Sequence, residues 1–171
     1  MKQILIGVST LMMLPFIACE DNKENETENS VNIIEITTSN VNDGSFYFNF
    51  FEGKKNSNSW HLSFENLDAG GGNYMPSFSL KNNVMLTIDN SSKFEEITAI
   101  PSTNLFGPSN GKLSFGGEHE VLTYDMQAHK ISVSDNNYII YDTVTYKVFK
   151  IHFDEYSGGV VIFRYAELTS N

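Results

Sequence analysis

The chain has almost no cysteine, and this scarcity limits its chemistry. Cys19 is the single cysteine among 171 residues. One cysteine cannot form a disulfide framework, and it cannot supply the several thiolates of a cysteine-based zinc site. Because Cys19 precedes the part of the chain that we expect to fold, a thiol nucleophile is excluded from that part as well.

Positive charge is also scarce. The 11 Lys and Arg residues are outnumbered by 21 Asp and Glu residues, so the net charge is −10 and the isoelectric point lies near 4.7. A protein that binds nucleic acid needs a basic surface to neutralise phosphates, and this chain has no basic cluster of that size. The same balance argues against electrostatic attraction to anionic lipid.

Several common catalytic and metal-binding patterns are missing too. No His-x-x-x-His pair of a zinc-binding helix occurs, and the glycine-rich residues 68–73 lack the lysine of a phosphate-binding loop. The carboxylate pairs at 95–96 and 154–155 are adjacent in sequence, so on strands they point to opposite faces. We interpret Glu118, His119 and Glu120 as a solvated loop, since three consecutive side chains rarely converge on one metal ion. We therefore predict a protein that is not an enzyme.

The N-terminus is typical of a targeting segment. Lys2 is followed by an apolar stretch, residues 4–17, that is too short to span a bilayer as a stable helix. An apolar residue, Ala18 and Cys19 together resemble a bacterial lipobox, which implies a signal peptide at 1–18 and lipid attachment at Cys19. Residues 19–30 form an acidic tether without apolar side chains to bury, either a surface-export signal or a spacer.

Residues 31–171 are predicted to be one mostly β, antiparallel domain with at most one or two short helices. Long helical periodicity is absent, and short alternating runs rich in Phe and Tyr are typical of strands. In residues 60–64 we expect Trp60, Leu62 and Phe64 to be buried and His61 to be solvated. Ser92 has capping-box spacing to Glu95 and predicts a short helix through residue 97. The expected strands are 31–38, 45–51, 60–64, 84–88, 122–124, 138–141 and the two arms of a closing hairpin, 149–165.

Met126 is the most unusual apolar residue, because it follows a strand at the point where the sequence turns polar. Its side chain is either folded back on the core, which periodicity alone favours, or exposed for a ligand. A thioether is a soft ligand that suits haem iron, as imidazole does.

Several segments, in order, resemble the HmuY family of haem-binding lipoproteins. Residues 60–64 are similar to a Trp-Asp-Ile-Ala-Phe type of motif, and residues 96–101 are similar to a segment ending in Val-Pro. Residues 124–129 are similar to a Tyr-Asn-Met-x-Thr-His segment, and residues 146–165 are similar to the closing strands. The resemblance spans roughly residues 46–168. It implies a mostly β fold, a lipid anchor on the outer membrane and often at the cell surface, and haem binding for iron acquisition with delivery to a TonB-dependent receptor.

The resemblance also implies axial ligands for haem iron, since two His or Met side chains grip the iron in that family. Met126 falls where the second ligand is expected, and the first is expected between Pro101 and Met126. That segment is shorter here than in the family and contains no other Met, which leaves His119 as the candidate. His129 is the alternative. The alternative function is a surface lipoprotein that binds another ligand, a glycan or a protein on the same scaffold.

Overall fold

The computed structural model describes residues 31–108, 113 and 119–169. The signal peptide, Cys19 and the acidic tether expected over residues 1–30 lie outside these ranges. Within them the chain is a mostly β, antiparallel domain with two short 3-10 helices, as the sequence predicted. Neither of these helices has the length and apolar character needed to cross a membrane.

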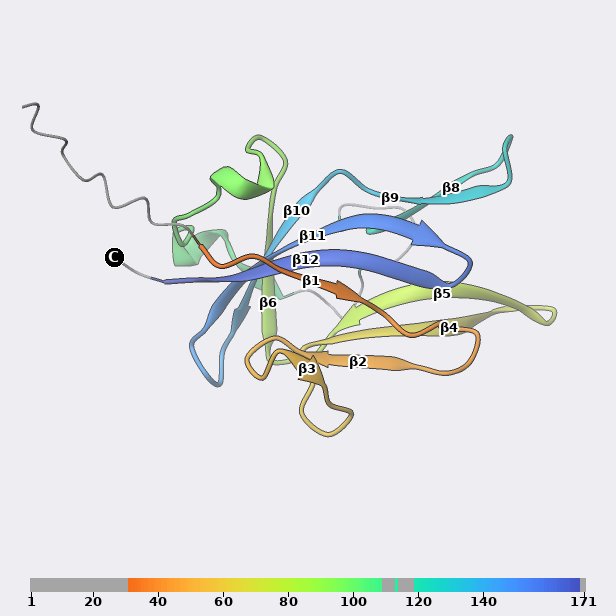
Figure 1. Cartoon of the computed structure of the whole chain (residues 1–171), viewed down its shortest axis with the longest axis horizontal. Helices are drawn as coiled ribbons and strands as arrows, with labels where there is room; N and C mark the ends of the chain where they lie inside the picture. Colours follow the sequence, from red (N-terminus) through yellow and green to blue (C-terminus); the bar gives the residue numbers. More distant parts are fainter. Residues whose placement is uncertain (1–30, 109–112, 114–118, 170–171) are drawn as a thin grey trace, which may run out of the picture.

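Two larger sheets and one hairpin make up the described part of the domain (Figure 1). The six-stranded sheet contains, in spatial order, β1 (Ile34–Thr37), β12 (Val160–Leu168), β11 (Val148–Ser157), β10 (Asn137–Asp142), β6 (Val84–Asp89) and β7 (Gly107–Pro108). The four-stranded sheet contains β3 (Lys54–Lys55), β2 (Phe46–Asn49), β4 (Leu62–Gly70) and β5 (Asn73–Leu80). The hairpin pairs β8 (Leu122–Asp125) with β9 (Lys130–Val133).

The two sheets pack face to face through aromatic side chains. Alternation in β2 turns Phe46 and Phe48 inward, and both are almost completely buried. The ring of Phe48 meets that of Phe163 edge-on at 5.6 Å, and the Phe78 ring lies 4.8 Å from that of Phe153. Such contacts join β2 and β5 to β11 and β12, and they place the main core between the sheets.

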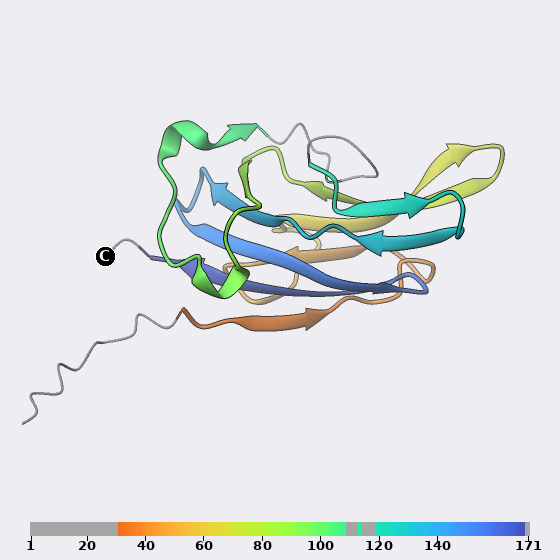
Figure 2. The same ribbon diagram turned by 90° about the horizontal axis from the view of Figure 1, so that it is seen from above.

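The outer face of the six-stranded sheet is covered as well. Residues 90–106, which we call the covering segment, carry η1 (Phe94–Glu96) and η2 (Thr103–Leu105) across it (Figure 2). Ile97 and Phe106 of this segment form a second apolar cluster with Ile139, Val148 and Leu168 of the sheet. The alternation in β11 had predicted one buried face, but Lys150 on the other face is also completely buried, because the covering segment lies over it.

The predicted helix at Ser92 is smaller than expected. Only the three residues of η1 are helical, its N-cap is Lys93, and no side chain caps it, so the capping-box prediction is wrong. The backbone N–H of Ser92 instead donates to Asp89, and the Ser92 carbonyl accepts from the side chain of Asn137. The turn is therefore held by contacts to the sheet.

The ends of the domain differ in what they carry. β1 begins at one end, and the β4–β5 and β8–β9 hairpins project at the other end (Figures 1 and 2). The glycine-rich residues 68–73 are the turn of the β4–β5 hairpin, where Gly70, Gly71 and Gly72 all have positive φ.

Candidate functional site

Met126 lies in the turn between β8 and β9, and its side chain is 79% exposed. Asp125 forms this turn, since its Oδ1 accepts the backbone N–H groups of Ala128 (3.0 Å) and Gln127 (2.7 Å). These bonds, first that from Ala128, lower the pKa of the Asp125 carboxyl. The interpretation that folds Met126 back on the core is wrong, because the strand ends at Asp125 and the turn directs the thioether into solvent.

His129 ends the same turn in the left-handed conformation, with φ of 49°. Its Nδ1 lies 2.8 Å from the hydroxyl of Tyr124, which steadies the exposed imidazole. Met126 and His129 belong to the same short turn, residues 126–129, between β8 and β9.

His119 lies before β8 and lines a pocket of about 640 Å³ that we call the His119 pocket. Its other lining residues include four apolar ones, Leu86, Ile88, Leu105 and Pro108, and the polar residues Thr87, Asn90 and Asn136. The length of β8, roughly 13 Å for four strand residues, separates His119 from the Met126 turn. The structure therefore brings Met126 close to His129 but not to His119.

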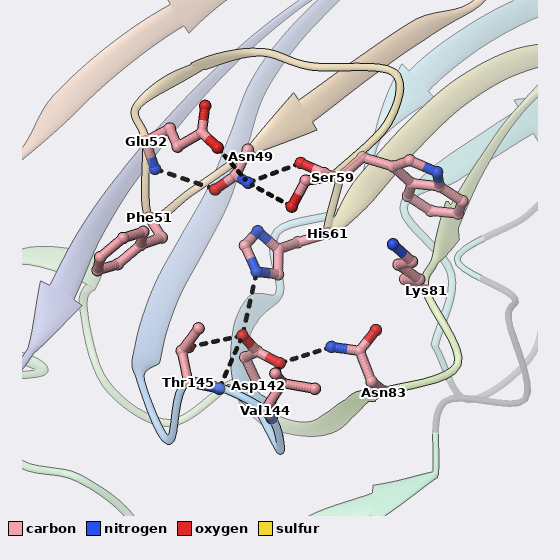
Figure 3. A pocket seen from close by; sticks show the side chains of 11 residues that line it. Asn49, Phe51, Glu52, Ser59, His61, Lys81, Asn83, Asp142, Val144 and Thr145 are labelled. Carbon is pink, nitrogen blue, oxygen red and sulfur yellow. Dashed lines mark hydrogen bonds and ion pairs between the residues drawn. The ribbon is translucent and has the colours of Figure 1, made fainter.

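A second pocket, of about 370 Å³, is built around His61 (Figure 3). We call it the polar pocket. It lies where the β2–β3, β3–β4, β5–β6 and β10–β11 connections meet, and it includes Asn49, Trp60, Lys81 and Asn83. The prediction that His61 is solvated is wrong, since the residue is only 5% exposed. His61 precedes β4, so the alternation of the strand does not apply to it, and the bend before Leu62 turns its ring inward.

Asp142 holds His61 from the opposite sheet. Its Oδ2 lies 3.3 Å from Nε2 of His61, and its Oδ1 accepts the side-chain amide of Asn83 at 2.5 Å. The hydroxyl and backbone N–H of Thr145 donate to Oδ2, and the backbone N–H of Val144 donates to Oδ1. A carboxylate that is 1% exposed is thus surrounded by donors, as a buried charge requires.

The contacts fix the protonation state of this pair. The backbone N–H of Phe50 donates to Nδ1 of His61, so the proton of the neutral ring is on Nε2 and faces Asp142. Burial lowers the pKa of His61. Burial raises the pKa of Asp142, but hydrogen bonds from Thr145, Val144, Asn83 and His61 outweigh it and leave the pKa below its ordinary value. The pair is therefore a neutral imidazole beside a carboxylate.

Both ring nitrogens of His61 are engaged, so the network lacks a free base. Within the described residues, no hydroxyl or thiol hydrogen-bonds to His61; the Thr145 hydroxyl bonds Asp142 instead. Residues 107–111 have the Gly-x-Ser-x-Gly spacing of a nucleophile elbow, but Ser109 lies outside the described residues and β7 is an edge strand of two residues. The hydrogen bonds around His61 and Asp142 hold the side chains of the polar pocket in place and join the two sheets.

His152 lies 3.8 Å from Asp154, the other pair of an imidazole and a carboxylate within ion-pair distance among the described residues. In the parts of the chain that the structure describes, no group of three His, Cys, Asp or Glu side chains has metal-binding geometry. Glu118 of the 118–120 run lies outside those parts.

Sequence reasoning missed the residues that build the polar pocket. Lys81, Asn83 and Asp142 are far apart in sequence and lie at strand ends, where turn-forming residues are ordinary. The one available signal was the run of polar residues after β5 and at the end of β10. That signal does not tell which turns lie together in space.

Comparisons of the chain with protein-family models, with curated proteins and with solved structures find no match. The geometry of the two pockets is therefore what bears on function.

Proposed function

We propose that the protein is a non-enzymatic, haem-binding lipoprotein of the outer membrane that takes part in haem and iron acquisition at the cell surface. The observation that carries the proposal is the position of His119, an imidazole beside a pocket of about 640 Å³. This volume lies within the range of small-molecule and cofactor sites. The resemblance of residues 46–168 to the HmuY family supports the same function.

The residues of the His119 pocket fit one face of a haem. His119 would ligate the iron, and Leu105 and Pro108 would cover part of the apolar ring. Asn90 and Asn136 offer amide donors for the propionates. Bound haem would supply a redox-active iron whose reduction potential depends on its axial ligands.

The second axial ligand is not supplied by Met126 in this arrangement, because β8 lies between the two residues. Met126 and His129 instead offer a separate candidate site at the β8–β9 turn. The proposal therefore has two alternative ligand sets, His119 in its pocket or Met126 and His129 in the turn.

A haemin titration of the mature chain separates these alternatives. We expect a shifted Soret band that saturates at one equivalent. His119→Ala should weaken binding by about tenfold or more if the pocket holds haem, while Met126→Ala and His129→Ala leave it unchanged. If Met126→Ala and His129→Ala weaken binding and His119→Ala does not, the haem site lies at the β8–β9 turn. A haemin spectrum that no addition of protein alters would overturn the proposal.

The location of the protein and its partner receptor need separate measurements. We propose lipid on Cys19 and delivery of haem to a TonB-dependent receptor. Cells fed labelled palmitate should label the wild-type chain and not Cys19→Ser. Protease added to intact cells should degrade the domain if it is exposed at the surface, and full protection would contradict surface exposure.

The alternative function is a surface lipoprotein that binds a different ligand, a glycan or a protein. The observation that favours it is the polar pocket, which shares no lining residue with the His119 pocket.

A further inference from the structure

The polar pocket has the build of a binding site. Four connections from both sheets form it, and the β strands hold each of them in place. Its floor is rigid, because the side chains of Asn49, His61 and Asp142 are buried and hydrogen-bonded. Its rim carries exposed apolar side chains, Phe51 at 58% and Val144 at 68%. A volume of about 370 Å³ suits a ligand of one or two small rings.

Most charged groups at this pocket already have partners. Glu52 pairs with Lys54 at 3.1 Å and accepts from the amide of Asn56. Asp142 has Asn83, Thr145 and His61 around it. The carboxylates of Glu52 and Asp142 already have hydrogen-bond or ion-pair partners, so we do not expect either to bind a cationic ligand.

Lys81 is different. Among the described residues, no Asp or Glu carboxylate lies within ion-pair distance of its ammonium, although the chain is strongly acidic. Its Nζ lies 5.9 Å from the centre of the Trp60 ring, and Figure 3 shows it pointing into the pocket beside Asn83. The side-chain oxygen of Asn83 points into the same space, while its amide nitrogen is held by Asp142. One cation, one acceptor and one indole ring therefore line the pocket.

We propose that the polar pocket binds a carboxylate-bearing sugar, a uronate residue free or at the end of a glycan. The carboxylate pairs with Lys81, a hydroxyl donates to the side-chain oxygen of Asn83, and the C–H face of the pyranose packs on Trp60. A purely apolar acid fits less well, because it would leave the side-chain oxygen of Asn83 facing it without a hydrogen bond. This site is distinct from the His119 pocket, and it does not depend on haem binding.

Trp60 makes the proposal measurable, because it is the single tryptophan of the chain and its fluorescence reports on this pocket. The titrants are glucuronate, methyl glucoside as the neutral match, acetate as the carboxylate without a ring, and a tetrasaccharide ending in glucuronate. We expect a saturable change with glucuronate, binding of the neutral sugar and of acetate weaker by about tenfold, and binding of the tetrasaccharide at least as tight as that of glucuronate if the source is a glycan.

Variants identify the groups responsible. Lys81→Gln should remove the preference for glucuronate over methyl glucoside, and Lys81→Arg should keep part of it. Lys93→Gln is the matched control, since that ammonium lies in the covering segment, is already paired with Glu96 and is 81% exposed. Circular dichroism checks that each variant is folded, and chemical shifts of the Trp60 indole N–H give a second readout.

Three outcomes would overturn the proposal: no saturable change with any sugar acid up to about 50 mM, equal binding of the acidic and neutral sugars, or an unchanged preference in Lys81→Gln. None of these depends on the haemin titration, so failure of one proposal leaves the other intact.

Discussion

The ammonium of Lys150 lies 2.7 Å from the backbone carbonyl of Phe94 and 4.4 Å from the centre of the Phe94 ring. Lys150 belongs to a central strand of the six-stranded sheet, and Phe94 belongs to the covering segment above it. The lysine thus fastens the segment to the sheet with a charged hydrogen bond and a cation–π contact. Burial lowers its pKa, since the charged form loses hydration there.

Two substitutions of Lys150 separate the effect of its charge on stability from the effect of its side-chain volume. Lys150→Met keeps most of the packing, so we expect a free energy of unfolding within about 1 kcal/mol of wild type at pH 7. Lys150→Ala also leaves a cavity and should cost about 3 kcal/mol. Urea unfolding measures both, and equal losses in the two variants would show that the charge, not the packing, stabilises the segment.

The lysine also predicts a pH dependence. Because its pKa is lower in the folded state, the unfolded chain binds more protons between that value and the ordinary value of about 10.4. The free energy of unfolding contributed by Lys150 therefore rises with pH over this window. Wild type should gain stability relative to Lys150→Met as the pH rises toward about 10.4, and parallel curves would contradict the shift.

The pair of His61 and Asp142 predicts a loss of stability when one partner is removed. Asp142→Asn should cost about 3 kcal/mol, because His61 and the donors around it lose a buried acceptor charge. Asp43→Asn is the control, an exposed carboxylate for which we expect a change below about 0.5 kcal/mol. Similar losses in both variants, measured by urea unfolding, would count against the pair.

Acid should weaken the same pair. The pKa of His61 is lowered on folding, so the unfolded chain takes up a proton near pH 6.5 that the folded chain does not. The pKa of Asp142 is lowered too, and its contribution is lost as pH falls below about 3.9 through its folded value. The free energy of unfolding should fall between pH 7.5 and 5.5, and His61→Gln should reduce that slope. Equal slopes in wild type and His61→Gln would contradict this prediction.

Gly159 is predicted to resist substitution. It has φ of 93°, and an added Cβ would clash with the side chains of Asn40 and, at 2.6 Å, Asn42. Asn40 cannot move freely, since its Oδ1 accepts the backbone N–H of Asn42. Gly72→Ala has a similar φ of 80° with open space around it, so it isolates the backbone strain. Thermal unfolding should show Gly159→Ala less stable than Gly72→Ala by about 1–2 kcal/mol.

Alternation in the sequence predicted the strands that carry the core, but not all strands. The inward positions of Phe46, Phe48 and Phe64 follow from period-two patterning, and all three are buried. Strand β5 contains Pro76, which argues against a strand, yet β5 is an edge strand where a missing N–H is tolerated. Strand β9 is only four residues long, which is too short for a clear alternation, and it is held by pairing with β8 and by Ile131 and Val133, which pack against the main core.

The site residues were predictable only where the local pattern decides the outcome. The turn at Met126 follows from Asp125, a residue that favours turns, but its exposure depends on where β8 ends. The burial of His61 and Lys150 depends on the β10–β11 turn and on the covering segment, which lie far away in sequence. Such long-range contacts leave no periodic signal in one chain, whereas strand alternation does.

The start of β1 and the β8–β9 turn occupy opposite ends of the long axis (Figure 1). A domain held through its N-terminal side is held from the end where β1 begins. The Met126 turn and the β4–β5 turn then point outward, away from the point of attachment. Under the proposed attachment through Cys19, large molecules in the surrounding medium would encounter these two turns first, and the exposed thioether of Met126 would be among the first groups they contact.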